Sequence, residues 1–469
     1  MQDVATIAAL SHEELVALVL KLINRVEQLE RENRQLREEI DELKRKGKRQ
    51  AAPFSKNQSV PDPKPAGRKS GSGRFERRAA PDPESYSQPP ISVHVGQNAC
   101  PSCGGDLRAD GSEIVTITDA PAAPPVVTAY EIEICRCQTC GKRVRGQHPE
   151  IAPDQFGATA HRLGVRVMAI AAWLHYGVGI PVRRVPSVLG ELCGVDVTQS
   201  ALTQDALTRA RMAVGAAHTQ IRTDIATREH LHADDTGWRI FGASAWLMGF
   251  SSEQETYFQI RSNHGSAEVT EVVSASYRGV LHTDRFRSYD AETLSRVPQQ
   301  KCLAHVIRNL DEAIAAQSGR ARALPMALRD LLRSAIDLWH QRDQLKDFRK
   351  RADDIADSVA HLLRERSLRS RINTRLVAEL GWHDDRGNLL RFLKEPHRCE
   401  PTNNEAERAL RPAVIARKVS QCSKTDAGAD AHASFTSVIA TAIKRGATSV
   451  VDALCRIFAT GEIPASFAD

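Results

Sequence analysis

The stretch Leu231-His-Ala-Asp-Asp-Thr-Gly-Trp-Arg-Ile240 has the composition and the two-residue alternation of a β-strand. Residues 245–250 and 256–261 repeat the pattern after short turns. A helix is expected over residues 266–276 and a fourth strand over 279–284. Three strands, a helix and a strand form the opening order of an RNase H-like fold, in which the fourth strand lies beside the first.

Strand alternation divides the acidic residues of this stretch between two faces. Asp234 shares a face with His232 and is predicted to line the cleft, whereas Asp235 lies on the opposite face or at the turn and is the alternative. Asp284 ends the fourth strand. Because that strand is expected beside the first, Asp234 and Asp284 are expected to approach each other.

A third carboxylate is expected from the segment 401–412, which contains Glu405 and Glu407. Two residues apart on a helix, these side chains point in nearly opposite directions. Thr402 and Glu405 have capping-box spacing, which gives Glu405 a structural use and leaves Glu407 for the site. The polar side chains predicted to share the face of Glu407 are Asn403, Asn404 and Arg411.

Two Asp and one Glu suit two Mg²⁺ or Mn²⁺ ions, which prefer hard oxygen ligands. Such a pair, about 3.5–4 Å apart, promotes in-line attack on a phosphodiester. Asp234, Asp284 and Glu407 are therefore the predicted catalytic and metal-binding residues. A helix cap or a surface charge is the alternative for any one of them.

Leucines recur every seven residues near the amino end, at Leu15, Leu22, Leu29, Leu36 and Leu43, with Val19, Val26, Asn33 and Ile40 between them. This heptad pattern predicts a coiled coil over residues 1–47. The polar Asn33 favours a parallel, in-register dimer. A helix packed on the protein's own body is the alternative.

Positive charge is concentrated after this segment. Residues 44–80 hold twelve Lys or Arg but only two acidic residues, in a chain of 469 residues with net charge +6. Residues 48–92 contain eight prolines and few apolar residues, which predicts a flexible linker. A concentrated basic block favours a nucleic-acid partner, and a merely solvated linker is the alternative.

Cys100-Pro-Ser-Cys103 and Cys137-Gln-Thr-Cys140 are two CxxC pairs 33 residues apart. Four thiolates at such spacing are typical of a structural zinc site. We expect one Zn²⁺ in a ribbon over residues 93–150, with Cys135 as an alternative ligand and a small β-ribbon over residues 114–130. Free thiols in a loop are the alternative.

Residues 151–229 have helical periodicity. Residues 185–193, Gly194 and residues 198–204 have the form of a helix, a turn and a capped second helix, which resembles a helix-turn-helix. An ordinary helical hairpin is the alternative. The side chains expected to reach base edges are Thr198, Gln199, Ser200 and Gln204, and weaker candidates for contacts near a scissile phosphate are His305, Arg308, Arg411 and Lys418.

These motifs together resemble the IS-sixty-six (TnpC-type) family of bacterial insertion-sequence transposases. The resemblance runs over nearly the whole chain and includes CPSCGG, LHYGVGIPVRR, HADDTGW, GVLHTDRFRSYD, KCLAHVIR and NNEAERALRP. It implies a DDE recombinase with the triad Asp234, Asp284 and Glu407, and suggests accessory proteins of the same element. The chain departs from the family after Asp284, where Arg285-Phe286 stand in place of Gly-Tyr.

The expected architecture is multi-domain α+β. Its parts are a coiled coil (1–47), a basic linker (48–92), a zinc ribbon (93–150), a helical helix-turn-helix-like module (151–229), an RNase H-like catalytic core (230–319 and 398–469) and a helical insertion (320–397). The sequence has no apolar run of about 18 residues, so no membrane span is expected. The isolated cysteines favour a reducing compartment. The expected location is the cytoplasm, in association with the nucleoid.

The predicted function is a homodimeric DNA transposase. It is expected to bind the ends of an insertion sequence and double-stranded target DNA, and to catalyse metal-dependent strand cleavage and strand transfer. The alternatives are a transposase-derived DNA-binding regulator, which would use the front-end modules with an inactive site, and an RNase H-like nuclease.

Overall fold

The computed structural model describes most of the chain after residue 162 and parts of the chain before it. The described residues are 11–13, 16–20, 22–30, 32–33, 81–97, 99–108, 112–118, 124–146, 148, 163–364, 368–420 and 422–467. Residues 55–129 form a unit of their own, separate from the unit that holds residues 1–54 and 130–469. The basic segment 44–80 lies outside the described residues.

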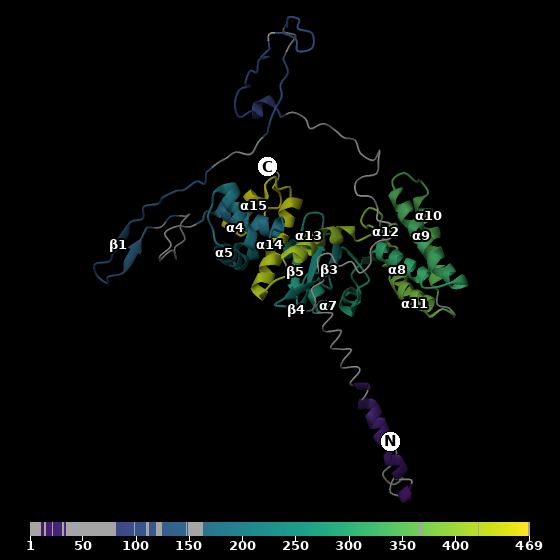
Figure 1. The fold of residues 1–469 in the computed structure, drawn as a ribbon. Coiled ribbons are helices and arrows are strands. Elements are labelled where there is room, and N and C mark those ends of the chain that lie inside the picture. Colours follow the sequence, from purple (N-terminus) through teal and green to yellow (C-terminus); the bar gives the residue numbers. More distant parts are fainter. Residues whose placement is uncertain are drawn as a thin grey trace. The chain divides into compact units, whose positions relative to one another are not determined.

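A mixed five-stranded sheet forms the centre of the larger unit (Figure 1). Its strands are β3 (His230–Ile240), β4 (Ala243–Ser251), β5 (Thr256–Arg261), β6 (Val280–Thr283) and β7 (Gln299–Lys301), in the order β5-β4-β3-β6-β7. β3, β4 and β5 pair antiparallel, whereas β6 is parallel to β3 and β7 is parallel to β6. The four predicted strands and the position of the fourth beside the first are confirmed.

The turn between β3 and β4 consists of two residues with positive φ, Phe241 at 51° and Gly242 at 81°. Such a turn matches the twist of paired strands. The expected helix after β5 is shorter than predicted, because α7 covers Ser266–Thr270 and the residues up to 276 form turns.

One face of the sheet is covered by helices from both ends of the larger unit. These are α3 (Val165–Ala172), α6 (Ala213–Ile225), α14 (Asp426–Lys444) and α15 (Val450–Thr460). Leu231 and Ala233 of β3 share a hydrophobic core with Val214 and Ile221 of α6. Of the helical module expected over residues 151–229, α6 is thus part of the core that supports the sheet.

The opposite face of β3 is crossed by α13 (Asn404–Ser420), and α14 lies along the edge strand β5 (Figure 1). Leu410 and Ala413 of α13 pack with Trp238 and Leu247 in a second core. This helix therefore begins and ends over the face of β3 that carries Asp234.

Between β7 and α13 the chain forms a group of helices with a hydrophobic core of its own. The helices are α8 (Leu303–Ala315), α9 (Ala323–His340), α10 (Phe348–Leu363), α11 (Arg371–Asp385) and α12 (Arg391–Lys394). The insertion was predicted to start at residue 320, whereas this core also includes α8, which comes earlier in the chain. The backbone N–H of Leu303 donates to the Pro401 carbonyl at 2.9 Å, so this excursion begins and ends at one place.

Two further helices, α4 (Val185–Cys193) and α5 (Gln199–Arg211), follow the short π-helix Trp173–Gly177. Gly194 ends α4 in the left-handed conformation (φ 63°), and the Thr198 side chain caps α5 by accepting from the Ala201 N–H. The predicted helix, glycine turn and capped helix are confirmed. The remaining short helices are Pro83–Ser85, Val182–Arg184, Arg287–Asp290, Glu292–Leu294 and Gly319–Arg322.

Nearer the amino end, the described residues between 12 and 33 are helical. β1 (Ile134–Arg136) and β2 (Arg143–Arg145) form a small antiparallel hairpin. The β-ribbon predicted over residues 114–130 is wrong for its described residues, none of which is in a strand; the hairpin lies immediately after it. Within the described ranges, no helix has the length and apolar character needed to cross a membrane.

Candidate active site

Strand register places Asp234 and Asp284 at equivalent positions. His232 of β3 pairs with His282 of β6 in the parallel ladder, and the two rings stack with centroids 4.2 Å apart. Asp234 and Asp284 each follow their histidine by two residues. Because the two strands run in the same direction, Asp234, inside β3, and Asp284, just past the end of β6, lie at equivalent positions of neighbouring strands.

The three predicted carboxylates form one electrostatic cluster. Burial raises the pKa of Asp234 to about 7, and the negative charges of Asp284, Asp235 and Glu407 contribute to this rise. A hydrogen bond from the Asp235 N–H to Asp234 Oδ1 (2.9 Å) opposes it. A carboxylate whose pKa is raised by its acidic neighbours fits a site for divalent cations, which remove the repulsion.

Asp235 has a partner of its own. Its Oδ2 lies 3.0 Å from His264 Nδ1, and the His264 ring stacks on Trp246 and Phe286. Burial raises the pKa of Asp235, while the bond and charge of His264 lower it. The predicted alternation therefore separates two environments, with Asp234 facing α13 and Asp235 held by an imidazole.

Glu407 lies in the first turns of α13, with 43% of its side chain exposed. Asn403, directly before this helix, is completely buried. Its Nδ2 donates to the Ala233 carbonyl at 2.8 Å, and its Oδ1 lies 3.1 Å from His232 Nδ1. These bonds hold the start of α13 against β3 beside Asp234. Sequence analysis places Asn403 in the polar stripe beside Glu407, and these bonds to β3 are contacts that it does not predict.

The predicted capping box of Thr402 and Glu405 is also wrong, because α13 starts at Asn404. Glu405 instead accepts from Lys444 Nζ at 2.7 Å and from Ser251 Oγ at 3.1 Å. Burial alone would raise the pKa of Glu405, but the bonds from Lys444 and Ser251 outweigh it and lower the pKa. Glu405 is thus a structural residue, through a partner other than the predicted one.

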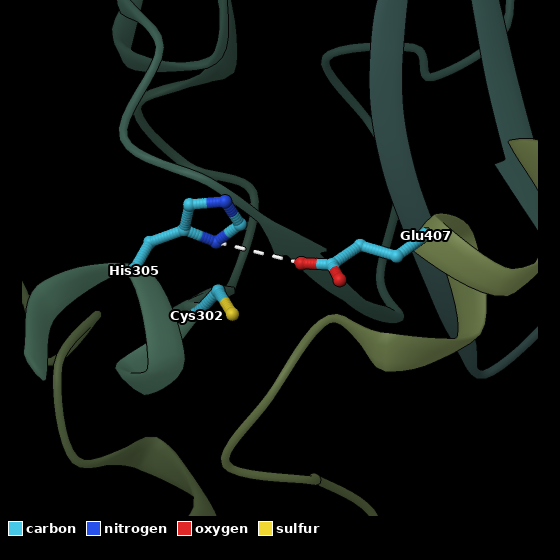
Figure 2. Close-up of side chains that lie close together, drawn as sticks. All are labelled: Cys302, His305 and Glu407. Atoms are coloured by element: carbon cyan, nitrogen blue, oxygen red, sulfur yellow. Dashed lines mark ion pairs between the residues drawn. The ribbon is translucent and has the colours of Figure 1, made fainter. Parts of the chain in front are cut away.

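Figure 2 shows Cys302, His305 and Glu407 pointing toward one another. His305 Nδ1 lies 3.8 Å from Glu407 Oε1, and one ligand atom of each residue lies within 4.8 Å of the others. In the described part of the chain, this is the one group of three such side chains so close together, so the oxygens of the predicted triad are more widely spaced. His305 is predicted as a phosphate contact; its approach to Glu407 was missed, although the Cys-x-x-His spacing was a signal for it.

Two buried cations support the strand ends. Lys301 is fully buried and lies 2.7 Å from Asp290 and 3.1 Å from Thr283 Oγ1. Arg285 pairs with Glu379 of α11 at 2.9 Å. Arg285, where the chain departs from the family pattern, therefore connects the end of β6 to the helical insertion.

The predicted zinc ligands lie in two turns that have matching backbone hydrogen bonds. Cys100 N–H donates to the Gly105 carbonyl and Cys137 N–H to the Lys142 carbonyl. Hydrogen bonds from backbone amides inside each turn, those of Ser102 and Cys103 and those of Cys140 and Thr139, lower the pKa values of Cys100 and Cys137. Thiols of this character suit metal ligation. Cys135 lies in β1 and is exposed.

The predicted DNA contacts are distributed over several helices. Gln199, Ser200 and Gln204 of α5 are exposed, whereas the Thr198 hydroxyl is used in the helix cap. Arg308, Arg411 and Lys418 are exposed on α8 and α13. The structure therefore leaves these side chains accessible to a large partner.

The mixed sheet, with acidic residues at equivalent positions of two parallel strands, is compatible with the class of protein that the sequence motifs suggest, a transposase. Residues 161–431 match the model of the family described as "Transposase IS66 family". The match covers more than half of the chain, so the chain belongs to the IS66 family of transposases. A search of curated proteins gave no match.

Proposed function

We propose that the chain binds the ends of its insertion sequence and carries out strand cleavage and strand transfer there. Membership of a transposase family implies DNA as the partner. The observation that carries the proposal is the placement of Asp234 and Asp284 two residues beyond the paired histidines of neighbouring parallel strands, with the charge of Glu407 acting on Asp234.

The sheet supports an RNase H-like catalytic core. Three antiparallel strands with two parallel strands beside the first give the order β5-β4-β3-β6-β7. Asp234 comes from the central strand, Asp284 from its parallel neighbour and Glu407 from the helix that crosses them. This arrangement lets three distant segments contribute one carboxylate each.

In this proposal Asp234, Asp284 and Glu407 hold two Mg²⁺ or Mn²⁺ ions. When bound, such ions activate water or a 3′-hydroxyl and stabilise the leaving oxygen. Asn403 fixes the start of α13, so that Glu407 stays near the two aspartates, and Asp235 keeps His264 in place. Oxygen donors of this kind fit hard divalent cations.

DNA binding is assigned to residues outside the carboxylate cluster. We assign phosphate contacts to the basic segment 44–80, which lies outside the described residues, and to exposed cations of α8 and α13. Gln199, Ser200 and Gln204 lie near the exposed start of α5, as a recognition helix requires.

Cys100, Cys103, Cys137 and Cys140 are proposed to hold one structural Zn²⁺. The heptad segment is proposed to form the dimer, and accessory proteins of the element are proposed as further partners.

The test is Mg²⁺-dependent cleavage and joining of labelled duplexes that carry the element's own ends. Asp234→Asn, Asp284→Asn and Glu407→Gln each remove one negative ligand and are expected to abolish both reactions while DNA binding remains. Asp235→Asn and Glu405→Gln are the matched controls, since they make the same chemical change at neighbouring positions.

Each other outcome identifies a different error. Full activity of Asp234→Asn or Asp284→Asn would contradict the two-metal proposal. Loss of activity in Glu405→Gln with retention in Glu407→Gln would show that the third carboxylate is Glu405 and that its assignment to Glu407 is wrong. Cleavage without any joining by the unmodified chain would favour a nuclease.

A further inference from the structure

A cavity of about 660 Å³ lies between helices α3 and α5 and the sheet. Its lining comes from the π-helix, α5, the far end of β3, and the junction of α13 with α14. Cavities of this size are typical of sites that take a small molecule or a single ring system. We call it the Trp238 cavity, after the β3 residue in its wall.

Two buried polar atoms in the lining have no hydrogen-bond partner. They are Nε2 of His432 and Oγ of Ser420, and His432 is only 9% exposed. Buried polar groups in proteins are nearly always paired. Both atoms have almost no accessible surface, so a ligand in the cavity would reach them only after the His432 and Ser420 side chains turn toward it.

Aromatic rings form part of the wall. Tyr176 stacks on Phe435 with centroids 4.5 Å apart, and Trp238 lies 4.8 Å from the His432 ring. All four residues line the cavity. Flat apolar walls next to unpaired polar atoms suit a planar ring that carries hydrogen-bonding groups, which is the chemistry of a nucleobase.

The rim of the cavity is polar and cationic. Arg183, Gln199 and Lys424 are lining residues that are also exposed to solvent. Gln199 is at the start of α5, where sequence analysis places a DNA contact. Cations around an aromatic cavity favour a base that is still attached to its phosphates.

The Trp238 cavity and the carboxylates share two elements. Asp234 and Trp238 lie on the same face of β3 four residues apart, roughly 13 Å at about 3.3 Å per residue. α13 likewise carries Glu407 near its start and Ser420 at its end. A strand of DNA advances about 3.4 Å per nucleotide in a duplex, so the cavity is about four nucleotides from the cluster.

We propose that the Trp238 cavity receives one base that has left the DNA stack while its strand lies at the carboxylate cluster. The inference rests on the proposed function, because it requires DNA at Asp234. The base lies against the aromatic part of the wall, and its polar edge meets His432 and Ser420 once these side chains turn toward it. Removing a base from the stack has a free-energy cost that binding in such a site offsets.

The test uses the full chain with duplexes that carry the element's end, in EDTA so that no cleavage occurs. 2-Aminopurine, whose fluorescence rises when it leaves the base stack, is placed in turn at each outer position of both strands. One position is expected to gain fluorescence several-fold on binding. Thr203→Trp should remove this gain, because Thr203 lines the cavity on α5 and a larger side chain would fill it.

Thr208→Trp is the matched control. Thr208 is exposed on the same helix, and its hydroxyl makes the same kind of bond to the carbonyl four residues earlier as that of Thr203. Thr208 does not line the cavity. The control variant should keep the gain, and His432→Phe, which preserves a ring but removes the unpaired nitrogen, should reduce it.

Three results would overturn the inference. DNA that is bound and, with Mg²⁺, cleaved, but without a fluorescence gain at any position, would contradict the inference alone and leave the proposed function intact. An equal gain in Thr203→Trp would place the unstacked base elsewhere. Failure of the unmodified chain to bind or cleave the ends would contradict the proposed function, and the inference would fail with it.

Discussion

Glu405 Oε1 lies 2.7 Å from Lys444 Nζ, so an ion pair joins the start of α13 to the end of α14. The Lys444 ammonium also donates to the Ser252 carbonyl at 2.6 Å, and Ser251 donates to the same carboxylate oxygen. Two acidic residues separated by one position on α13 therefore differ in role. Glu405 is engaged in packing, while Glu407 points toward His305.

Glu405→Gln is expected to lower the free energy of unfolding by roughly 1–3 kcal/mol, because it leaves a partly buried ammonium without its charged partner. Thermal unfolding of the variant gives this value. Adding Lys444→Met should cost less than the sum of the two single changes. Unchanged stability together with lost cleavage would show instead that Glu405 acts in the reaction.

His218 is expected to make stability depend on pH. Burial lowers its pKa to about 4 in the folded chain, from an ordinary value of 6.5. The contribution of His218 to stability should therefore be complete above about pH 6.5 and be lost by up to about 1.4 kcal/mol per pH unit as the pH falls toward 4.

Urea unfolding between these pH values measures the effect. His218→Gln should reduce the slope, since the unfolded chain then takes up one proton fewer. His397→Gln is the control, because that side chain is 70% exposed. Equal slopes in the unmodified chain and in His218→Gln would refute the assignment.

Zinc content is expected to be about one ion per chain. Changing Cys100, Cys103, Cys137 and Cys140 together to Ser should remove the ion and weaken DNA binding. Elemental analysis measures the content, with Asp234→Asn as a control that should keep its zinc. Loss of zinc from Cys135→Ser, but not from Cys137→Ser, would identify Cys135 as the ligand.

The helical segment near the amino end is expected to form a dimer. Its described apolar heptad side chains are 42–56% exposed within one chain, at Val19, Leu22, Val26 and Leu29. Leu29→Pro should abolish association, because a proline within the helix removes a backbone bond and clashes with the preceding turn. Sedimentation of the full chain tests this, with Glu27→Ala on the outer face as the control. A monomeric unmodified chain would contradict the prediction.

Glu379→Gln is expected to destabilise the chain by about 1–3 kcal/mol, since Arg285 is 8% exposed and would keep an uncompensated charge. Asp330→Asn is the control, because Asp330 is 61% exposed and its partner Arg329 keeps a second carboxylate, that of Asp311. Chemical unfolding compares the two variants. An equal, small effect would show that Arg285 is not held by Glu379.

Four of the five strands, all except β7, were predictable from sequence because alternation is a local property. A two-residue period placed Asp234 and Asp235 in different environments, and the same period placed Asp284 after a buried strand. The helix, turn and helix around Gly194 were predictable for the same reason, since a glycine and a capping threonine act on their immediate neighbours.

Contacts between distant segments were not predictable in this way. Lys444 follows Glu405 by 39 residues, so the capping box was the nearest local explanation for that carboxylate. The role of Asn403 was not predictable because no local pattern reveals that its amide bonds to β3. The core shared by α6 and the sheet likewise depends on packing, which periodicity alone leaves open.

The hydrogen bond between Leu303 and Pro401 has a consequence for how this protein can diverge. The intervening helices leave and re-enter the sheet at a single point and have a core of their own, so the entropy of closing that excursion depends only weakly on its length. Relatives can therefore lengthen, shorten or replace these helices while both flanking carboxylates stay in register. Selection can act more freely on the rest of the excursion than on His305 and Glu379, which contact Glu407 and the neighbour of Asp284.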